Sequence, residues 1–229
     1  MSKGKILQAL SVLHPGSSVF ELCAIGVKQP RAPIWEGHAG GKKPIVAGWF
    51  MDHQKAADLA VQLEQIKAEG IYITLNSCNP ALLARANHRL IAGVNRTQDA
   101  DITLLRHLLV DVDPKRPQGI SASLTEHEAA LQLTQRIKKD MEVQGWPEPI
   151  WADSGNGGHL LYRIDLPNTP ENIDLIKRCL KALAEKYTTD DLSIDQSVFN
   201  PSRLCKLYGT TARKGDHISE RPHRIARIL

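Results

Sequence analysis

The chain has 229 residues, of which 42% are hydrophobic and 24% are charged, as is ordinary for a soluble globular protein with a core. A formal net charge of +4 and an isoelectric point near 8.9 are compatible with a polyanionic partner but do not require one. Aromatic residues make up only 5%, which argues against a stacking surface of the kind that single-strand binders use.

The cysteines and the N-terminus give no signal of secretion. The four cysteines are far apart and form no C-x-x-C pair, so neither a zinc ribbon nor a disulfide framework is indicated, and we expect reduced thiols. They are Cys23, Cys78, Cys179 and Cys205. Residues 1–5 are followed by only a short apolar stretch. We therefore expect no signal peptide, no membrane partner and a cytoplasmic location.

In the N-terminal part, the spacing of apolar residues predicts strands and helices in turn. A short helix is expected at residues 6–13, strands at 19–27, 45–50 and 71–75, and helices from about 52 to 70 and from 81 to about 91. Polar loops are expected at 30–43 and 93–101. Lys42 and Lys43 in the first loop could reach a phosphate, although a solvated loop is the plainer interpretation.

The C-terminal part begins with a strand that runs into Asp111. Ser123-x-x-Glu126 has the form of a capping box and predicts a helix to about residue 143. Strands at 149–152 and 160–164 follow, then a helix at 170–186, a polar stretch and a short helical turn from residue 200. Because strands and helices are mixed without strict alternation, the expected class is α+β, or α/β with a mixed sheet. Residues 104 to about 195 predict an RRM-like unit, with a boundary near 93–101.

An apolar run leads into two aspartates, Asp111 and Asp113, which Pro114 follows. An apolar run that ends at a proline predicts a buried strand. Strand side chains alternate between faces, so the two carboxylates would lie on the same side, about 7 Å apart. Such a pair can share one or two hard cations with substrate phosphates. A solvated turn in which the aspartates cap the backbone is the alternative.

The segment S-G-N-G-G-H at residues 154–159 lies between two predicted strands. Its glycines allow backbone amides to approach a ligand and to form an anion nest. Ser154 adds a hydroxyl, and His159 could donate to a phosphate oxygen. A plain glycine hairpin is the alternative, because the segment is not a G-x-G-x-x-G fingerprint and no helix follows it.

A third carboxylate, Asp195, could complete a metal site, although Asp190 and Asp191 compete for that role. A basic run follows, in which Arg203 and Lys206 are three residues apart and would share a face on a helical turn. Cations close to carboxylates can hold a nucleotide triphosphate. The alternative is a basic surface loop. The chain contains no P-loop, H-E-x-x-H or G-x-S-x-G motif.

Together these features resemble the archaeo-eukaryotic primase superfamily, and more narrowly the primase-polymerase (prim-pol) domain of phage and plasmid replication proteins. Three motifs stand in the family's order: hhhDxD at residues 109–113, S-G-x-G-x-H at 154–159 and hD at 194–195. Two flanking segments are also similar: residues 74–76 with the helix that contains Arg85, and the run that contains Arg203, Lys206, Gly209-Thr210 and Lys214-Gly215. The resemblance covers most of the chain from residue 71 onward.

The resemblance implies a template-directed DNA primase or polymerase that adds nucleotides to a 3′-hydroxyl and releases pyrophosphate. Asp111, Asp113 and Asp195 would coordinate two Mg2+ or Mn2+ ions, and His159 would act with them. Nucleotide contacts are implied for Ser154, His159, Arg203, Lys206, Lys214 and Asn76. The substrates would be NTPs or dNTPs, and the partners a single-stranded DNA template and a primer.

The implied fold is one prim-pol domain over residues 1–229, with a central catalytic cleft. An N-terminal α/β subdomain, residues 1–95, would pack on an RRM-like catalytic subdomain, residues 96–229, with a mixed or antiparallel sheet. Two departures from the wider superfamily stand out. No zinc site is evident, and the chain ends at Leu229 where relatives usually continue into a helicase. This favours a domain of a longer primase-helicase protein from a bacterium, an archaeon or a phage-infected cell.

Two other function classes fit parts of the pattern. An apolar strand that ends in D-x-D also opens the haloacid-dehalogenase phosphatases, in which the first aspartate is a nucleophile. Here, however, the motif lies in mid-chain and Asp190-Asp191 does not follow an apolar strand. The second class is a non-catalytic DNA-binding replication initiator module. Three acids facing a phosphate backbone would repel DNA unless a metal were bound, so metal-dependent activity separates this class from an enzyme.

Overall fold

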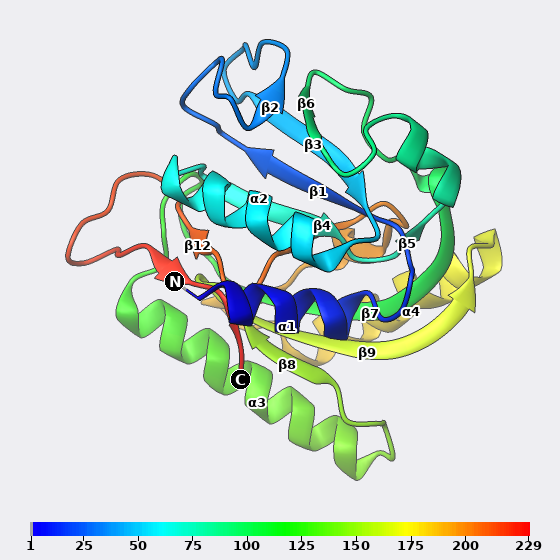
Figure 1. The fold of residues 1–229 in the computed structure, drawn as a ribbon. Helices are drawn as coiled ribbons and strands as arrows, with labels where there is room; N and C mark the ends of the chain where they lie inside the picture. The colour runs from blue at the N-terminus through cyan, green and yellow to red at the C-terminus, as the bar shows by residue number, and fades with distance from the viewer. Residues whose placement is uncertain (1) are drawn as a thin grey trace. The chain divides into compact units, whose positions relative to one another are not determined.

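The computed structural model describes residues 2–229, which form a mixed α+β structure with four α-helices and several sheets (Figure 1). The predicted α+β class is therefore confirmed. The chain divides into two compact units. Unit 1 comprises residues 1–104 and 201–211, and unit 2 comprises residues 105–200 and 212–229. Along the chain, the first boundary between the units falls between residues 104 and 105, within a strand.

Unit 1 is built on a six-stranded sheet with the order β11-β4-β1-β3-β6-β2. The strands are β1 (Phe20–Ile25), β2 (Trp35–Glu36), β3 (Ile45–Phe50), β4 (Gly70–Thr74), β6 (Leu90–Ala92) and β11 (Leu204–Lys206). Strand β1 pairs antiparallel with both β3 and β4, and β2 runs parallel to β6. Strand β5 (Ser77–Cys78) pairs instead with the first residues of β7 (Ile102–Pro114).

The helices of unit 1 are α1 (Lys3–Leu13) and α2 (His53–Gln65), which pack beside each other. Helix α2 also packs against β3 and β4, and Figure 1 shows it in cyan beside the strands. It begins after Asp52, whose side chain accepts hydrogen bonds from the amides of Gln54 and Lys55. This cap satisfies backbone donors that have no partner within the helix. The strand predicted at residues 45–50 is confirmed at the same residues.

The helix predicted from residue 81 to about 91 is wrong. A short 3₁₀ helix, η1 (Pro80–Ala84), is followed by β6. Backbone hydrogen bonds join this stretch to Trp49 of β3, whose N–H donates to the carbonyl of Ala86 and whose carbonyl accepts from the amide of His88. His88 has a φ of 53°, which is incompatible with a right-handed helix. Pairing with a distant strand therefore prevailed over local helix propensity. A second 3₁₀ helix, η2 (Asp99–Asp101), lies in the predicted loop.

Unit 2 contains the element order β-α-β-β-α-β. These elements are β7, α3 (Leu124–Val143), β8 (Ile150–Asp153), β9 (Gly158–Pro167), α4 (Pro170–Tyr187) and β10 (Leu192–Ile194). Its sheet has the order β10-β7-β9-β8-β14, so β7 lies between β10 and β9. Helix α3 packs against β9, and α4 packs against β10 and the 3₁₀ helix η3 (Gln196–Phe199). The last elements are β12 (Thr211–Ala212), β13 (Arg224–Ile225) and β14 (Arg227–Ile228).

Local signals account for the helices of unit 2. Helix α3 has the predicted capping box, in which Ser123 and Glu126 each accept a hydrogen bond from the other's amide. Helix α4 begins with Pro170 after the cap Thr169, and proline suits the first helical position because its missing N–H needs no partner there. Strand β10 lies within the stretch that was predicted to be polar and irregular. Its three residues are too few for a periodic pattern to stand out.

Candidate functional site

Asp111 and Asp113 lie near the end of β7, a 13-residue strand that continues past both of them to Pro114. Their side chains share one face of the sheet because strand side chains alternate. Leu108, Leu109 and Val110 before them are buried. The two carboxylates remain partly open, with 21% of the Asp111 side chain and 35% of the Asp113 side chain exposed. The strand thus runs from the buried core to an end at which both carboxylates reach solvent.

Asp195 follows β10, which pairs antiparallel with β7. Ile194 lies opposite Val112, and the N–H of Asp195 donates to the carbonyl of Asp111 at 2.9 Å. Asp195 therefore lies opposite Asp111, and residues directly opposite in an antiparallel pair point to the same face. Its carboxylate accepts a hydrogen bond from the amide of Ser197 at 2.7 Å and caps η3. The backbone of the third acid is thus aligned with the pair, while its side chain is engaged locally.

His159 lies on β9, the other neighbour of β7. Its Nε2 is 3.3 Å from Oδ1 of Asp111, and only 6% of its side chain is exposed. His159 and Asp111 are 48 residues apart in the sequence, and the β7–β9 pairing brings them together. The structure therefore places this histidine beside the D-x-D pair, within reach of a group bound to Asp111.

The glycine turn at residues 154–157 connects β8 and β9 and touches β7. A Cβ on Gly157 would lie 2.1 Å from the carbonyl oxygen of Val112 and 2.8 Å from Oδ1 of Asp113. A Cβ on Gly158 would lie 2.1 Å from Oγ1 of Thr134 on α3. Only glycine allows the backbone to come this close on both sides. The glycines therefore allow the turn to lie close to β7, the strand that carries the D-x-D motif.

The amides of this turn are already occupied, which removes the anion-nest interpretation. The N–H of Gly155 donates to Oδ1 of Asp153, and the N–H groups of Asn156 and Gly157 donate to Oγ of Ser154. The Ser154 hydroxyl in turn contacts the Gly157 carbonyl at 3.2 Å. The segment is a serine-closed glycine turn, the alternative that the sequence left open.

An arginine of the turn that follows β7 lies beside Asp113. Nη1 of Arg116 is 3.6 Å from Oδ1 of Asp113, and this arginine is held by the carbonyls of Pro114 and Ile120. Desolvation raises the pKa of Asp113, and the charge of Asp111 raises it further. The positive charges of Lys214, Arg116 and His159 counteract that rise. Sequence reasoning proposed Lys214 but missed Arg116. Its position in the basic turn directly after the aspartates was the available signal.

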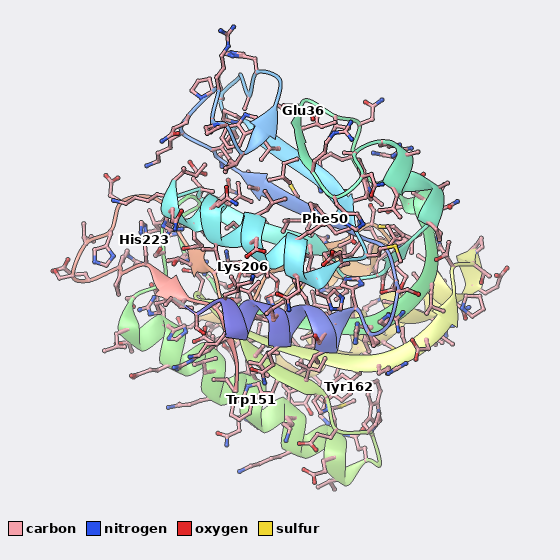
Figure 2. All side chains as sticks on the ribbon, viewed as in Figure 1. Glu36, Phe50, Trp151, Tyr162, Lys206 and His223 are labelled. Carbon is pink, nitrogen blue, oxygen red and sulfur yellow. The ribbon has the colours of Figure 1, made fainter. Side chains whose placement is uncertain are left out.

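The other proposed nucleotide contacts belong to unit 1. The amide of Asn76 is buried and donates to the carbonyl of Pro201. Lys206, labelled in Figure 2, is 5% exposed. Its ammonium donates to the carbonyl of Thr211 and lies 5.4 Å from the ring centre of Tyr72. The helical turn expected around Arg203 is wrong because residues 204–206 form β11. In extended backbone, residues three apart point to opposite faces, so Arg203 and Lys206 do not share one.

The donor set suits a hard divalent cation. Two carboxylates on one face match the way Mg2+ binds through one or two carboxylates together with substrate phosphates and water. Desolvation, and after it the like charge of Asp111, raises the pKa of Asp113, and a bound cation would offset both effects. Among residues 2–229, no group of three or more His, Cys, Asp or Glu side chains is arranged to hold a metal ion. Oδ1 of Asp195 accepts the Ser197 amide, and a carboxylate can use its second oxygen for a cation at the same time.

Comparisons of the chain with protein-family models, with curated proteins and with solved structures found no match. Within residues 2–229, no helix is both long and apolar enough to cross a membrane. The interpretation of the site therefore depends on its own geometry and on the motifs of the sequence.

Proposed function

We propose that this chain is a primase-polymerase that transfers nucleotides to a 3′-hydroxyl under the direction of a DNA template. One observation carries the proposal. Three sequence motifs far apart in the chain come together on one sheet: Asp111 and Asp113 lie on β7, His159 lies on the neighbouring β9, and Asp195 directly follows β10, the other neighbour of β7. The direct contact between His159 and Asp111 joins two of these motifs.

The fold of unit 2 supports the same proposal. Its β-α-β-β-α-β order, with β7 between β10 and β9, is the ferredoxin-like arrangement that RRM-like units share. A prim-pol would carry its metal-binding acids on such a sheet, with the D-x-D motif on the first strand and the hD motif after the last. Asp111, Asp113 and Asp195 occupy those positions. Fold alone does not define an activity, so the proposal depends on the acids and the histidine.

The roles of the residues follow from their placement. Asp111 and Asp113, joined by Asp195, would hold Mg2+ or Mn2+. When bound, these ions would supply activation of the 3′-hydroxyl and neutralisation of triphosphate charge. His159 is placed to donate a hydrogen bond to a phosphate oxygen above Asp111. The ammonium of Lys214 would compensate further phosphate charge, since it already acts on Asp113. Catalysis would come from positioning and charge, without a covalent protein intermediate.

The expected partners follow from the reaction. They are a single-stranded DNA template, a primer and NTPs or dNTPs, with a helicase domain in a longer chain as a further expectation. The proposal keeps three residues of unit 1 as expected nucleotide contacts: Asn76, Arg203 and Lys206. The contacts of Lys206 with Thr211 and Tyr72 make a structural role for it the simpler one.

The test is extension of a labelled primer on a single-stranded template, with dNTPs or NTPs and with Mg2+ or Mn2+. Asp111→Ala is the test variant, and Asp174→Ala, which removes an exposed acid of α4 that pairs with Arg178, is its matched control. Metal-dependent extension that Asp111→Ala loses and Asp174→Ala keeps would support a polymerase. DNA binding without extension under any combination would instead indicate a non-catalytic DNA-binding module.

A further inference from the structure

A buried carboxylate that takes no part in the proposed chemistry lies directly beneath the glycine turn. Asp153 is the last residue of β8 and is 2% exposed. It lies opposite Gly158 in the β8–β9 pair, so its side chain is on the face that Gly158 turns toward α3. One oxygen, Oδ1, accepts the N–H of Gly155 at 2.7 Å and contacts Nε2 of His127 at 2.9 Å.

The histidine is fixed as firmly as the carboxylate. His127 is 6% exposed and lies in the first turn of α3, where its N–H donates to the carbonyl of the cap residue Ser123. Because an ionised carboxylate only accepts hydrogen bonds, Nε2 of His127 carries the hydrogen and donates it to Asp153. Nε of Arg227 on β14 lies 3.7 Å from the second oxygen of Asp153. Asp153 thus joins α3, the glycine turn and β14.

The glycine turn that Asp153 holds also contacts the candidate site. Gly155 has a φ of 90°, a conformation that glycine tolerates and that its bond to Asp153 helps to hold. Two residues later, Gly157 rests against Val112 and Asp113 of β7. Gly158 rests against Thr134 of α3, and His159 follows at once. A shift of the turn would therefore move His159 relative to Asp111 and loosen the packing against Asp113.

We propose that His127 and Asp153 are positioning residues of the nucleotide site, which act through the Gly155 amide to set the distance between His159 and the D-x-D pair. Neither residue touches the substrate. The proposal rests on the proposed function, because the site it tunes is the one assigned to the triphosphate. Outer residues that orient ligand-binding groups typically contribute about 10- to 100-fold in activity or affinity. A displacement of about 1 Å costs a similar factor.

The test compares two polar replacements of the same residue. The amide nitrogen of glutamine reaches about as far as Nε2 of histidine, whereas that of asparagine reaches only about as far as Nδ1. His127→Gln therefore keeps a donor for Asp153, and His127→Asn removes it. Glu126→Gln is the control for stability, since it weakens the Glu126–Arg221 ion pair on the same helical turn without touching Asp153. Asp153→Asn is a second variant, which weakens both bonds by removing the charge.

The measurements are kcat and KM for the incoming nucleotide, hydrogen exchange of the amides of residues 154–158, and unfolding by denaturant. We expect His127→Asn to raise the nucleotide KM, to lower kcat/KM by about 10- to 100-fold and to speed exchange at Gly155. The kcat/KM of His127→Gln should stay within about threefold of the wild-type value. The kcat/KM of Asp153→Asn should fall between those of His127→Asn and His127→Gln. Glu126→Gln should lower stability and leave the nucleotide KM unchanged.

Several results would overturn the proposal. In an active protein, equal kinetics and exchange for His127→Asn and the wild type would remove the positioning role. A loss of kcat/KM in His127→Asn that is no larger than the loss in Glu126→Gln would also remove the positioning role, because such a loss would reflect stability alone. If His127→Asn does not fold, an unchanged nucleotide KM in Asp153→Asn decides against the proposal. A wild-type chain that neither extends primers nor binds nucleotide would overturn the proposed function itself, and this proposal with it.

Discussion

Glu21 of unit 1 and Asp113 of unit 2 are both carboxylates with charged neighbours, and the two have opposite surroundings. Glu21 of unit 1 is fully buried, with Arg96 Nε 2.6 Å from one oxygen and the N–H of Thr97 2.9 Å from the other. The hydroxyl of Thr97 in turn accepts the indole N–H of Trp49. Asp113 of unit 2 has a like charge, Asp111, on the same strand face, and its pKa is raised.

The difference separates a structural charge from one that we propose to be functional. Both carboxylate oxygens of Glu21 have a donor, so the network holds residues 96 and 97 to β1 and needs no ligand. The Asp111–Asp113 pair does not balance its own charge. Burial and the repulsion between the two carboxylates both disfavour two negative charges there. A group whose own fold disfavours its charged form is one that a bound cation can stabilise. The predictions below test that contrast, from the largest expected effect to the smallest.

Replacing Asp113 by Asn should abolish function without harming the fold. We expect metal-dependent primer extension to fall by about 10³-fold or more, because a metal-holding charge is worth several kcal/mol in the transition state. The folded state holds the Asp113 proton more tightly than the unfolded state, so ionisation of Asp113 opposes folding above about pH 4. A neutral Asn removes that cost, so the unfolding free energy should stay equal or rise.

The unfolding free energy of Asp113→Asn is measured by urea denaturation at pH 7 without divalent ions, beside the extension assay. A gain of about 1 kcal/mol or less is expected, because a third of the side chain reaches solvent. A clear loss of stability in this variant would show that Asp113 is a structural charge like Glu21.

Replacing Glu21 by Gln should have the opposite outcome. The change leaves Arg96 without its counter-charge, and breaking a buried ion pair costs about 3–5 kcal/mol of unfolding free energy. Glu36→Gln is the control, since it breaks the exposed pair with Arg89, which is worth about 0–1 kcal/mol. Equal denaturant midpoints for the two variants would contradict the structural role of Glu21.

Divalent ions should stabilise the protein through the D-x-D pair. At an ion concentration about 100 times the dissociation constant, linkage adds about 2.7 kcal/mol to the unfolding free energy. The melting temperature of the wild type should therefore rise with Mn2+ or Mg2+, and that of Asp113→Asn should rise much less. An equal rise in both proteins would place the ion elsewhere.

The glycine turn gives the smallest effect. Gly157→Ala forces a Cβ against the Val112 carbonyl and should cost about 1–3 kcal/mol of stability together with some activity. Gly4→Ala is the control, because the nearest atom to a Cβ added at Gly4 in α1 is Oγ of the Ser2 side chain, at 3.4 Å. Alanine there should stabilise the helix by about 0.5–1 kcal/mol. Calorimetry compares the two, and a neutral Gly157→Ala would mean that the turn is not packed on β7.

Local chemistry explains which elements were predictable. The Ser123–Glu126 box and the apolar run before Asp111 are signals that a single segment carries, and α3 and β7 formed as expected. Residues 81–91 carried a plausible helical pattern, but hydrogen bonds to Trp49 on β3 drew them into a different conformation. Residues 204–206 became a strand for a similar reason, since β4 pairs with them across more than a hundred residues. A local sequence pattern does not show a pairing partner that lies so far away in the chain.

The same division holds for the candidate site. The sequence alone determined that Asp111 and Asp113 share a face, because alternation along a strand is a local property. Only the tertiary structure placed His159 against Asp111, aligned Asp195 with it and set Arg116 beside Asp113. It also diverted the Asp195 carboxylate to Ser197 and filled the glycine turn with its own hydrogen bonds. Strand order and register decide those contacts, and both follow from packing of the whole sheet.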